Sequence, residues 1–171
     1  MHVTFASTDL GKVLIAARDV QKGVTAVLVG PQEETLISDL QKRFPDMTIE
    51  PGFPGFEKLV AKVLLKLENP GLNCDLPLDM QGTPFQIRVW KALKKIPSGQ
   101  TATYADIANR IKQPQAVRAV ANACGANHLA ILVPCHRVIR SDGTLGGYRW
   151  GKRCKKRLLQ KEQNQISAAA A

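Results

Sequence analysis

The sequence predicts an α+β protein built from two parts. The first part is a small antiparallel or mixed sheet with flanking helices, and the second is mainly helical. Three observations predict this: short Val- and Ile-rich segments come first, segments with apolar residues at helical spacing follow, and the charge changes sign after residue 81. The 171 residues suffice for one ordinary domain or two small ones. We therefore expect domains at 1–81 and 82–171.

Strands are predicted at the amino terminus. Residues 2–7, 12–18 and 24–29 are rich in Val, Ile, Leu and Thr, and Asp9-Leu10-Gly11 and Gln21-Lys22-Gly23 separate them. Strands joined by such short polar turns favour a three-stranded antiparallel meander.

Helices follow the predicted meander. Apolar residues recur at helical spacing in 32–43 and in 55–67. Residues 47–49 between them are consistent with an edge strand, and residues 76–78 with a short extended piece. We expect both helices to cover one side of the sheet.

The helical part begins with a capping signal. Thr83-Pro84-Phe85-Gln86 has a hydroxyl for the N-cap, Pro at the first helical position and Gln at the third, and Pro97-Ser98-Gly99 ends the helix. Two shorter helices at 104–111 and 115–124 suggest a helix-turn-helix, with a plain helical hairpin as the alternative. Their predicted buried residues are Tyr104, Ile107, Ala108, Ile111, Ala116, Val117 and Val120.

Charge is distributed unevenly along the chain. Residues 1–81 carry 8 Lys and Arg against 11 Asp and Glu, whereas residues 82–171 carry 16 against 3, a net +13. Such asymmetry favours a polyanionic partner, because basic side chains release counterions condensed on phosphates. A solvated basic face without a ligand is the alternative. An anionic membrane is disfavoured, because no stretch combines an apolar face with the basic residues.

Cysteine and histidine spacing argues against a metal centre. Cys74, Cys124, Cys135 and Cys154 form no Cys-x-x-Cys pair, and the chain has 3 histidines. Four scattered cysteines do not suggest a disulfide framework either. With no signal-peptide pattern and no apolar run of membrane-spanning length, we expect a soluble, reduced, intracellular protein.

The last thirty residues contain a loop and a helix. Residues 141–151 are rich in glycine but lack the Lys-Ser/Thr of a phosphate-binding loop. A terminal helix is predicted over 155–163, and the tail Ser167–Ala171 is expected to fray because it has nothing to pack against.

Cys135 is the strongest catalytic candidate. The apolar run 131–133 is expected to be a buried strand ended by Pro134, and the thiol is followed directly by His136 and Arg137. A cysteine beside two groups that can hold positive charge is placed to be a thiolate nucleophile. The alternative is a small buried hydrophobe, which is what most unpaired cysteines are.

The helix at 115–124 is unusual for one that reads bases. It is rich in alanine, and Arg118 is the large polar side chain it offers. Small residues allow close approach to a narrow minor groove while specifying little sequence, and Arg118 could fill a gap in the duplex. An ordinary buried alanine-rich helix is the alternative.

An imidazole that takes the thiol proton needs an acid to orient it. Successive strand residues point to opposite faces, so a water or a turn must couple Cys135 to His136. Acidic candidates in this half are Asp106, Asp142 and Glu162. Glu162 is favoured because it can fold back without belonging to a loop or the DNA-binding segment, and a solvated surface charge is the alternative.

A family resemblance rests on these residues. Pro134-Cys135-His136-Arg137-Val138, with Arg118-Ala119-Val120 and Asn127 before it and Gly147-Tyr148-Arg149-Trp150-Gly151 after it, resembles the O6-alkylguanine-DNA alkyltransferases. The likeness is greatest to the carboxyl-terminal domain of bacterial adaptive-response (Ada-type) proteins. It is dense from Gly82 to Glu162 and looser before, and it implies an RNase H-like amino-terminal domain.

The resemblance implies a role for each matching residue. Cys135 would accept the alkyl group, His136 would deprotonate it through a water, and Glu162 would complete the relay. Asn127 would tie the recognition helix to the active-site turn, and Tyr104 would offer its hydroxyl to the guanine. The implied DNA-binding residues are Arg118, Ala116, Ala119 and Tyr104, and the implied pocket residues are Tyr148, Arg149, Pro134, Val138 and Lys155.

The implied function is stoichiometric repair of alkylated DNA. An alkyl group would move from O6 of guanine, and from O4 of thymine, to Cys135 after minor-groove binding and nucleotide flipping. The product thioether has no water-labile bond, so one molecule would act once. We expect a monomer without cofactor or metal that binds double-stranded DNA with little sequence specificity. It would be cytoplasmic in a bacterium or archaeon and nuclear in a eukaryote.

Two other functions stay open, and some residues stay unassigned. The first alternative is a non-repairing alkyl-DNA-binding protein, although relatives of that kind lack the acceptor cysteine. The second is a Cys-His thiol transferase or hydrolase acting on a small molecule, which leaves the basic half unexplained. The cysteine-rich zinc domain of adaptive-response proteins has no counterpart here, and the chain could be a fragment of a larger one. Cys124, Arg140 and Cys154 receive no role.

Overall fold

The structure is a computed structural model that describes residues 1–19, 21–50, 52–72 and 75–170. Cys74 and Ala171, both considered above, lie outside the described residues. The chain divides into two compact units. Unit 1 comprises 1–68, 72–80 and 128–130, and unit 2 comprises 69–71, 81–127 and 131–171.

Unit 1 is built on an antiparallel meander. The strands β1 (His2–Thr8), β2 (Gly11–Ala17) and β3 (Val24–Gly30) pair in the order β1-β2-β3, with Phe5 opposite Leu14 and Leu14 opposite Leu28. Every residue of β2 from Val13 to Ala17 is fully buried. The alternating Val, Ile and Leu of the central strand therefore form the core of this unit.

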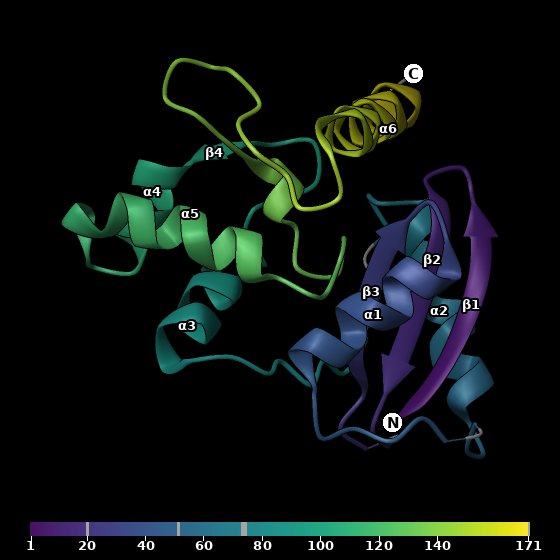
Figure 1. The fold of residues 1–171 in the computed structure, drawn as a ribbon. Coiled ribbons are helices and arrows are strands. Elements are labelled where there is room, and N and C mark those ends of the chain that lie inside the picture. Colours follow the sequence, from purple (N-terminus) through teal and green to yellow (C-terminus); the bar gives the residue numbers. More distant parts are fainter. Residues whose placement is uncertain (20, 51, 73–74, 171) are drawn as a thin grey trace. The chain divides into compact units, whose positions relative to one another are not determined.

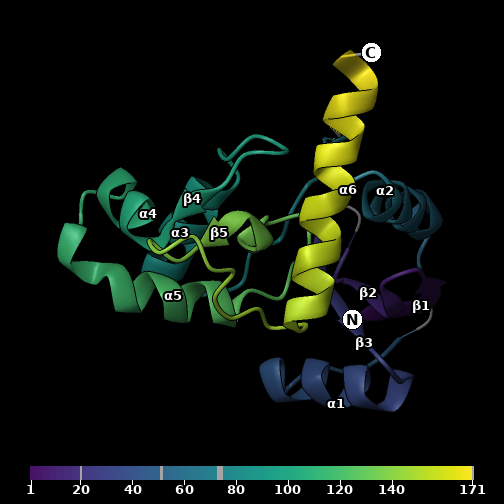
Figure 2. The ribbon, with the colours of Figure 1, turned by 90° about the horizontal axis from the view of Figure 1, so that it is seen from above.

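Two helices cover the meander. Leu36 and Leu40 are the buried residues of α1 (Glu33–Arg43), and α2 (Phe56–Glu68) buries Phe56, Leu59, Val63 and Leu67. Figures 1 and 2 show α1 and α2 on opposite faces of the sheet, so the expectation that both cover one side is wrong. Each helix buries one apolar stripe, and a sheet buried on both faces accommodates both stripes.

The edge strand expected at 47–49 is absent, whereas the extended piece expected at 76–78 is present and joins the sheet through one bridge. Residues 47–49 carry no strand, and Glu50 alone bridges to His2 in parallel. Likewise, Leu78 alone of residues 76–78 bridges to Val24. Pro77 has no amide hydrogen to extend a ladder, which accounts for the second case.

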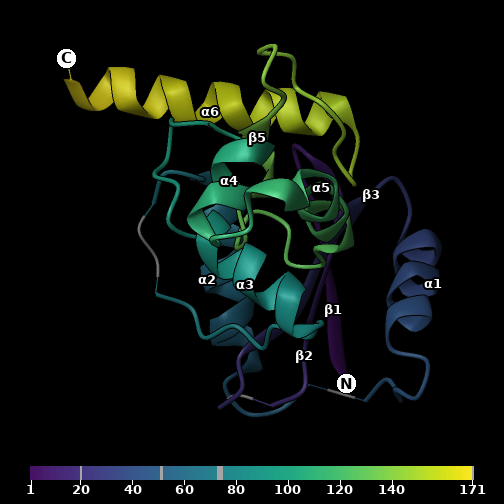
Figure 3. The same cartoon turned by 90° about the vertical axis from the view of Figure 1, so that its left-hand side faces the viewer.

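Unit 2 begins with three packed helices. The capping box predicted at Thr83 and Gln86 is present at the start of α3 (Pro84–Leu93). A short 3-10 turn, η1 (Pro114–Ala116), joins α4 (Tyr104–Arg110) to α5 (Val117–Ala126). Figure 3 shows α3 beside α4 and α5. The buried Trp90 of α3 donates from Nε1 to the Ala123 carbonyl of α5 at 2.9 Å, which fixes that packing.

A two-stranded parallel ladder and the last helix complete unit 2. Strand β4 (Ala102–Thr103) pairs with β5 (Val138–Ile139), and the 3-10 turn η2 (Cys135–Arg137) precedes β5. Helix α6 (Lys152–Ala170) is longer than the predicted 155–163, and Ser167–Ala170 continue it rather than fray. Alanine has the highest helix propensity, which favours this extension.

The buried strand predicted before Cys135 is absent. Residues Ala130–Val133 form turns and a bend, with Ile131 at a φ of +68°. The side-chain amide of Asn127 donates from Nδ2 to the carbonyl of Val133, and this hydrogen bond favours a turn over an extended segment. Cys135 is therefore presented by a 3-10 turn, and the strand β5 follows it.

Candidate active site

Cys135 is held at the first position of η2 by an asparagine from the end of α5. Nδ2 of the fully buried Asn127 donates to the Val133 carbonyl at 3.0 Å and to Cys135 Sγ at 3.1 Å. Because Asn127 is the C-cap of α5, one side chain connects the helix end to the thiol turn. The position of Cys135 is therefore coupled to the position of α5.

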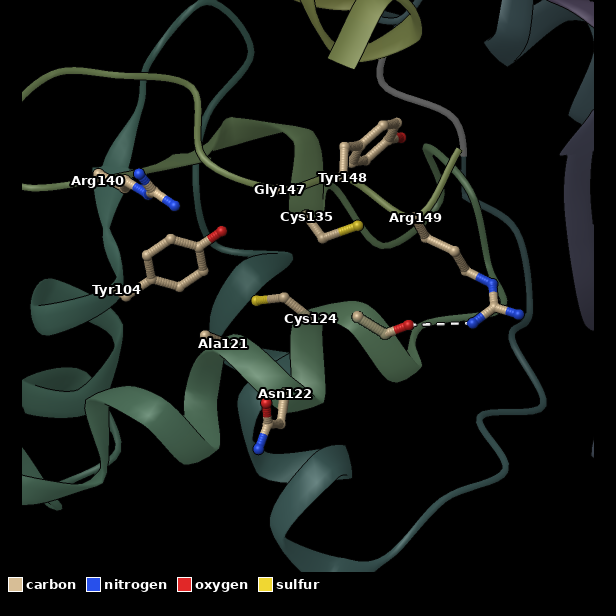
Figure 4. Close-up of a pocket in the computed structure, with 10 residues that line it drawn as sticks. Tyr104, Ala121, Asn122, Cys124, Cys135, Arg140, Gly147, Tyr148 and Arg149 are labelled. Carbon is tan, nitrogen blue, oxygen red and sulfur yellow. Dashed lines mark hydrogen bonds between the residues drawn. The ribbon is translucent and has the colours of Figure 1, made fainter. Parts of the chain in front are cut away.

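The thiol lies at a pocket of about 390 Å³ formed within unit 2. Cys135 is only 4 % exposed, and it nevertheless contributes to the pocket wall. Figure 4 shows two sulfur atoms at the cavity, one from Cys135 and one from Cys124 of α5. The lining residues are Tyr104, Ala121, Asn122, Cys124, Gly125, Cys135, Arg140, Gly147, Tyr148 and Arg149.

Behind the thiol lies a buried charge cluster centred on Glu162 of α6. Glu162 Oε1 lies 2.7 Å from His136 Nε2, and both side chains have no exposed surface. Arg137 donates from Nε at 3.1 Å and from Nη2 at 2.8 Å to the same carboxylate, and the Gly99 amide donates at 3.0 Å. Four donors thus surround one carboxylate, as buried charges require.

This cluster fixes the tautomer of His136. Burial raises the pKa of Glu162, but hydrogen bonds from His136 and Arg137 outweigh it and lower the pKa to about 2. An ionised carboxylate only accepts, so the proton on the imidazole is on Nε2. Burial also lowers the pKa of His136, so the ring is neutral and Nδ1 has a free lone pair. Among the described residues no protein group hydrogen-bonds to that Nδ1.

Arg137 does not act on the thiol as expected. The sequence placed its charge beside Cys135, yet its Nη1 donates to the Ile96 carbonyl at 2.6 Å while the rest of the guanidinium engages Glu162. With three residues per turn, residues two apart in a 3-10 turn point in different directions, so Arg137 and Cys135 face different neighbours.

Lys155 is the cation that influences the thiol. Its ammonium is fully buried and donates to the carbonyls of Val138, Leu145 and Gly147, the first at 2.5 Å and the last at 3.4 Å. Burial lowers the pKa of Lys155, and its charge in turn lowers the pKa of Cys135. Three carbonyl acceptors compensate part of the cost of burying the ammonium, and they tie β5 to the glycine-rich loop.

The resting sulfur is a thiol rather than the expected thiolate. Burial raises the pKa of Cys135 to about 11, although the Asn127 hydrogen bond and the Lys155 charge act in the opposite direction. The expected positive partners were His136 and Arg137, whereas the groups that lower the pKa are Asn127 and Lys155, and desolvation is the larger effect.

The expected DNA-binding residues lie along α4 and α5. Arg118 and Ala119 are exposed, Ala116 is half-buried, and Tyr104 at the start of α4 lines the pocket. Val117, expected in the core, is 38 % exposed. The 3-10 turn at 114–116 rotates the start of α5 outward, and Ala123 and Cys124 are buried in its place.

Three of the expected pocket residues lie behind the pocket wall. Tyr148 and Arg149 line the cavity, whereas Pro134, Val138 and Lys155 are not among the lining residues. The side chain of Val138 is fully buried in β5, and Lys155 is occupied by carbonyl groups. Arg149 Nη1 donates to the Gly125 carbonyl at 3.2 Å, so this arginine lies along the pocket rim (Figure 4).

Several lining residues were missed or left without a role by the sequence analysis. Asn122 was overlooked on α5, and Cys124 and Arg140 were noted but unassigned. The helical spacing of Cys124 from Ala121 could have placed both on one face toward the thiol. Nothing in the local sequence around Arg140 indicated the loop that brings it to the pocket.

The described residues contain neither a metal-binding cluster nor a membrane-spanning helix. In the part of the chain that the structure describes, no three His, Cys, Asp or Glu side chains are arranged to hold a metal ion. Across the same residues, no helix has both the length and the apolar character needed to cross a bilayer.

Known proteins resemble this chain closely. Residues 84–164 match the family described as 6-O-methylguanine DNA methyltransferase, DNA binding domain. The Escherichia coli protein "Bifunctional transcriptional activator/DNA repair enzyme Ada" is 48 % identical over 95 % of this chain and 45 % of its own length. The chain thus spans about half the length of this relative. The inducible methylated-DNA–protein-cysteine methyltransferase of Bacillus subtilis is 44 % identical over 82 % of this chain and 80 % of its own length.

A solved structure extends the likeness to the fold. The crystal structure of Mycobacterium tuberculosis OGT in complex with DNA superposes with a TM-score of 0.78 at 36 % identity, covering 96 % of this chain and 94 % of that one. The mixed α+β architecture is therefore shared along nearly the full length of both chains. These comparisons show that the chain belongs to the family of methylated-DNA–protein-cysteine methyltransferases.

Proposed function

We propose that this protein repairs alkylated DNA by moving an alkyl group from O6 of guanine to the sulfur of Cys135. The arrangement that supports it most directly is the thiol at a pocket, held by Asn127 and followed by a His136–Glu162 pair whose imidazole has a basic Nδ1. A methyl group on guanine O6 is a weak electrophile and requires a thiolate, so a base beside the thiol is needed.

The relay works through His136. A water between Cys135 and Nδ1 would carry the thiol proton to the ring, and the resulting imidazolium would be stabilised by Glu162 at 2.7 Å. The sulfur then attacks the alkyl carbon, the C–O6 bond breaks, and the guanine leaves with its electron pair. A proton or hydrogen bond to the departing base comes from Tyr104, whose hydroxyl lies on the pocket wall.

The product explains why the reaction is stoichiometric. A thioether forms on Cys135, and no group in the described pocket can hydrolyse a C–S bond. Each molecule would therefore act once. The same chemistry extends to O4-alkylthymine, which offers an equivalent alkyl–oxygen bond.

DNA would be bound by α4, η1 and α5 as a helix-turn-helix. The exposed Arg118 and Ala119 and the half-buried Ala116 support a close approach to the minor groove with little sequence preference. A target base reaches a buried thiol only after rotating out of the duplex, and Arg118 would fill the gap in the stack. We further propose an RNase H-like relationship for unit 1, on the basis of its antiparallel meander, and a monomer as the active form.

Intact-mass spectrometry after incubation with an O6-methylguanine duplex tests the proposal. We expect one methyl group on Cys135, none on the Cys135→Ala variant, and retained DNA binding by that variant. Cys124→Ala is the matched control, because Cys124 supplies the other pocket sulfur, and it should keep methyl uptake. An unchanged mass would favour a non-repairing DNA-binding protein, and repeated turnover would favour a hydrolase.

A further inference from the structure

Arg140 and Tyr104 stand together at the pocket because of a strand register. In the parallel ladder Ala102 pairs with Val138 and Thr103 pairs with Ile139. The residues that follow each strand are Tyr104 and Arg140, and both line the pocket that holds Cys135. Figure 4 shows the Arg140 side chain extending near the hydroxyl end of the Tyr104 ring.

The backbone of Arg140 is held in place by a turn. Its amide donates to the Thr144 carbonyl at 2.9 Å, and its carbonyl accepts from the Gly143 amide at 3.0 Å. The loop then crosses close to both side chains at Gly146, where φ is +67°. A Cβ there would lie 3.3 Å from Tyr104 Oη and 3.4 Å from Arg140 Cγ. Glycine at this position therefore allows the loop to pack against the pair.

The guanidinium of Arg140 remains available. Among the described residues it makes no hydrogen bond and no ion pair, and the residue is exposed. Asp142 interacts with it electrostatically, but Asp142 Oδ1 accepts from Thr144 N at 2.9 Å and from Thr144 Oγ1 at 2.7 Å. An arginine with a backbone held by hydrogen bonds and with unused guanidinium donors is suited to bind a planar or tetrahedral oxyanion.

We propose that Arg140 binds the backbone phosphodiester beside the nucleotide whose base enters the pocket. This inference rests on the proposed function. A nucleotide rotated into a pocket carries its flanking phosphate to the rim, and phosphates are the anionic groups of such a substrate. Arg140 therefore positions the flipped nucleotide through its phosphate at the pocket rim, whereas the groups around Cys135 act on the base.

Single-turnover methyl uptake by the full chain tests the inference. We expect Arg140→Gln to slow reaction with an O6-methylguanine duplex about tenfold, as expected for losing one charge-assisted hydrogen bond, and to leave reaction with free O6-benzylguanine unchanged. Arg140→Lys should recover part of the rate through its charge. Arg153→Gln, an exposed arginine of α6 away from the pocket lining, is the matched control and should react like the native chain.

Methylphosphonate substitution identifies the ligand. Neutralising the phosphate on either side of O6-methylguanine, one at a time, should slow the native chain at one of the two positions and cause no further loss in Arg140→Gln. Duplex binding is also measured in a Cys135→Ala background at several salt concentrations. Adding Arg140→Gln should reduce the slope of log binding constant against log salt concentration by about one, the value for one phosphate contact. The inference would be overturned if Arg140→Gln slowed the reaction with free O6-benzylguanine as much as the reaction with the duplex. It would also be overturned if the effects of Arg140→Gln and of the methylphosphonate were fully additive. Failure of the native chain to take up methyl would instead overturn the proposed function, and the binding measurement would still test Arg140.

Discussion

Replacing Glu162 by Gln should destabilise unit 2 in a pH-dependent manner. The carboxylate accepts from His136, Arg137 and Gly99, and these bonds outweigh burial to bring its pKa from 4.5 to about 2. Since one pKa unit corresponds to about 1.4 kcal/mol, ionised Glu162 stabilises the fold by at most about 3 kcal/mol at neutral pH. Removing one partner of a buried ion pair typically lowers the free energy of unfolding by a similar amount.

The sign follows from the direction of the shift. A carboxylate with a lowered folded pKa stabilises the protein above pH 4.5, and this contribution is lost as pH falls toward 2. The glutamine variant has no such titration. The difference in unfolding free energy between native chain and variant should therefore narrow by about 2 kcal/mol between pH 6 and pH 3.

Tryptophan fluorescence during urea unfolding measures this difference. The two tryptophans, Trp90 and Trp150, both belong to unit 2, so the signal reports on the unit that contains Glu162. Glu34→Gln alters an exposed carboxylate on α1 and should leave the curves unchanged. A gap between native chain and Glu162→Gln that stays constant from pH 6 to pH 3 would refute the electrostatic reasoning.

Three further substitutions, and Gly147→Ala as a control, probe the DNA-binding and loop geometry. Arg118→Ala should slow repair in duplex DNA more than reaction with free O6-benzylguanine, and equal losses would remove the proposed role in the stack. Thr103→Ala removes the cap whose hydroxyl accepts from Asp106 N at 3.1 Å, and thermal unfolding should report a loss of about 1 kcal/mol. Gly146→Ala forces a side chain into a φ of +67° beside Tyr104 Oη, which should cost about 1 kcal/mol and slow methyl uptake, whereas Gly147→Ala should meet no neighbour within 4 Å and retain stability.

Elements with strong local signals were predicted well. The capping box at Thr83 and the three strands of the meander are present, because each depends on residues only a few positions apart. The scarcity of acidic residues in the second half favoured Glu162 over Asp106 and Asp142, and the family resemblance then implied the same residue. The structure brings Glu162 to His136 from 26 residues away along the chain.

Elements decided by tertiary contacts were not predictable. The apolar run at 131–133 has the composition of a strand, but the Asn127 side chain binds the Val133 carbonyl and the chain turns there. The position of Arg137 in the sequence predicts a partner of the thiol, but its guanidinium donates to Glu162 and to the Ile96 carbonyl instead. In both cases side-chain hydrogen bonds outside the local pattern outweigh the local preference.

The raised pKa of Cys135 makes its reactivity depend on bound substrate. With a pKa of about 11, roughly one thiol in ten thousand is ionised at pH 7, which adds about 5 kcal/mol to any attack by a preformed thiolate. In the proposed reaction, proton transfer to His136 during the attack would avoid much of this cost, because Glu162, 2.7 Å from the ring, would stabilise the imidazolium as it forms. A buried, protonated sulfur is also protected from stray electrophiles and oxidants, which react with exposed thiolates. If each molecule acts once, as proposed, burial would limit unproductive loss of Cys135, and the proposed relay would activate the thiol only when an alkyl group is aligned.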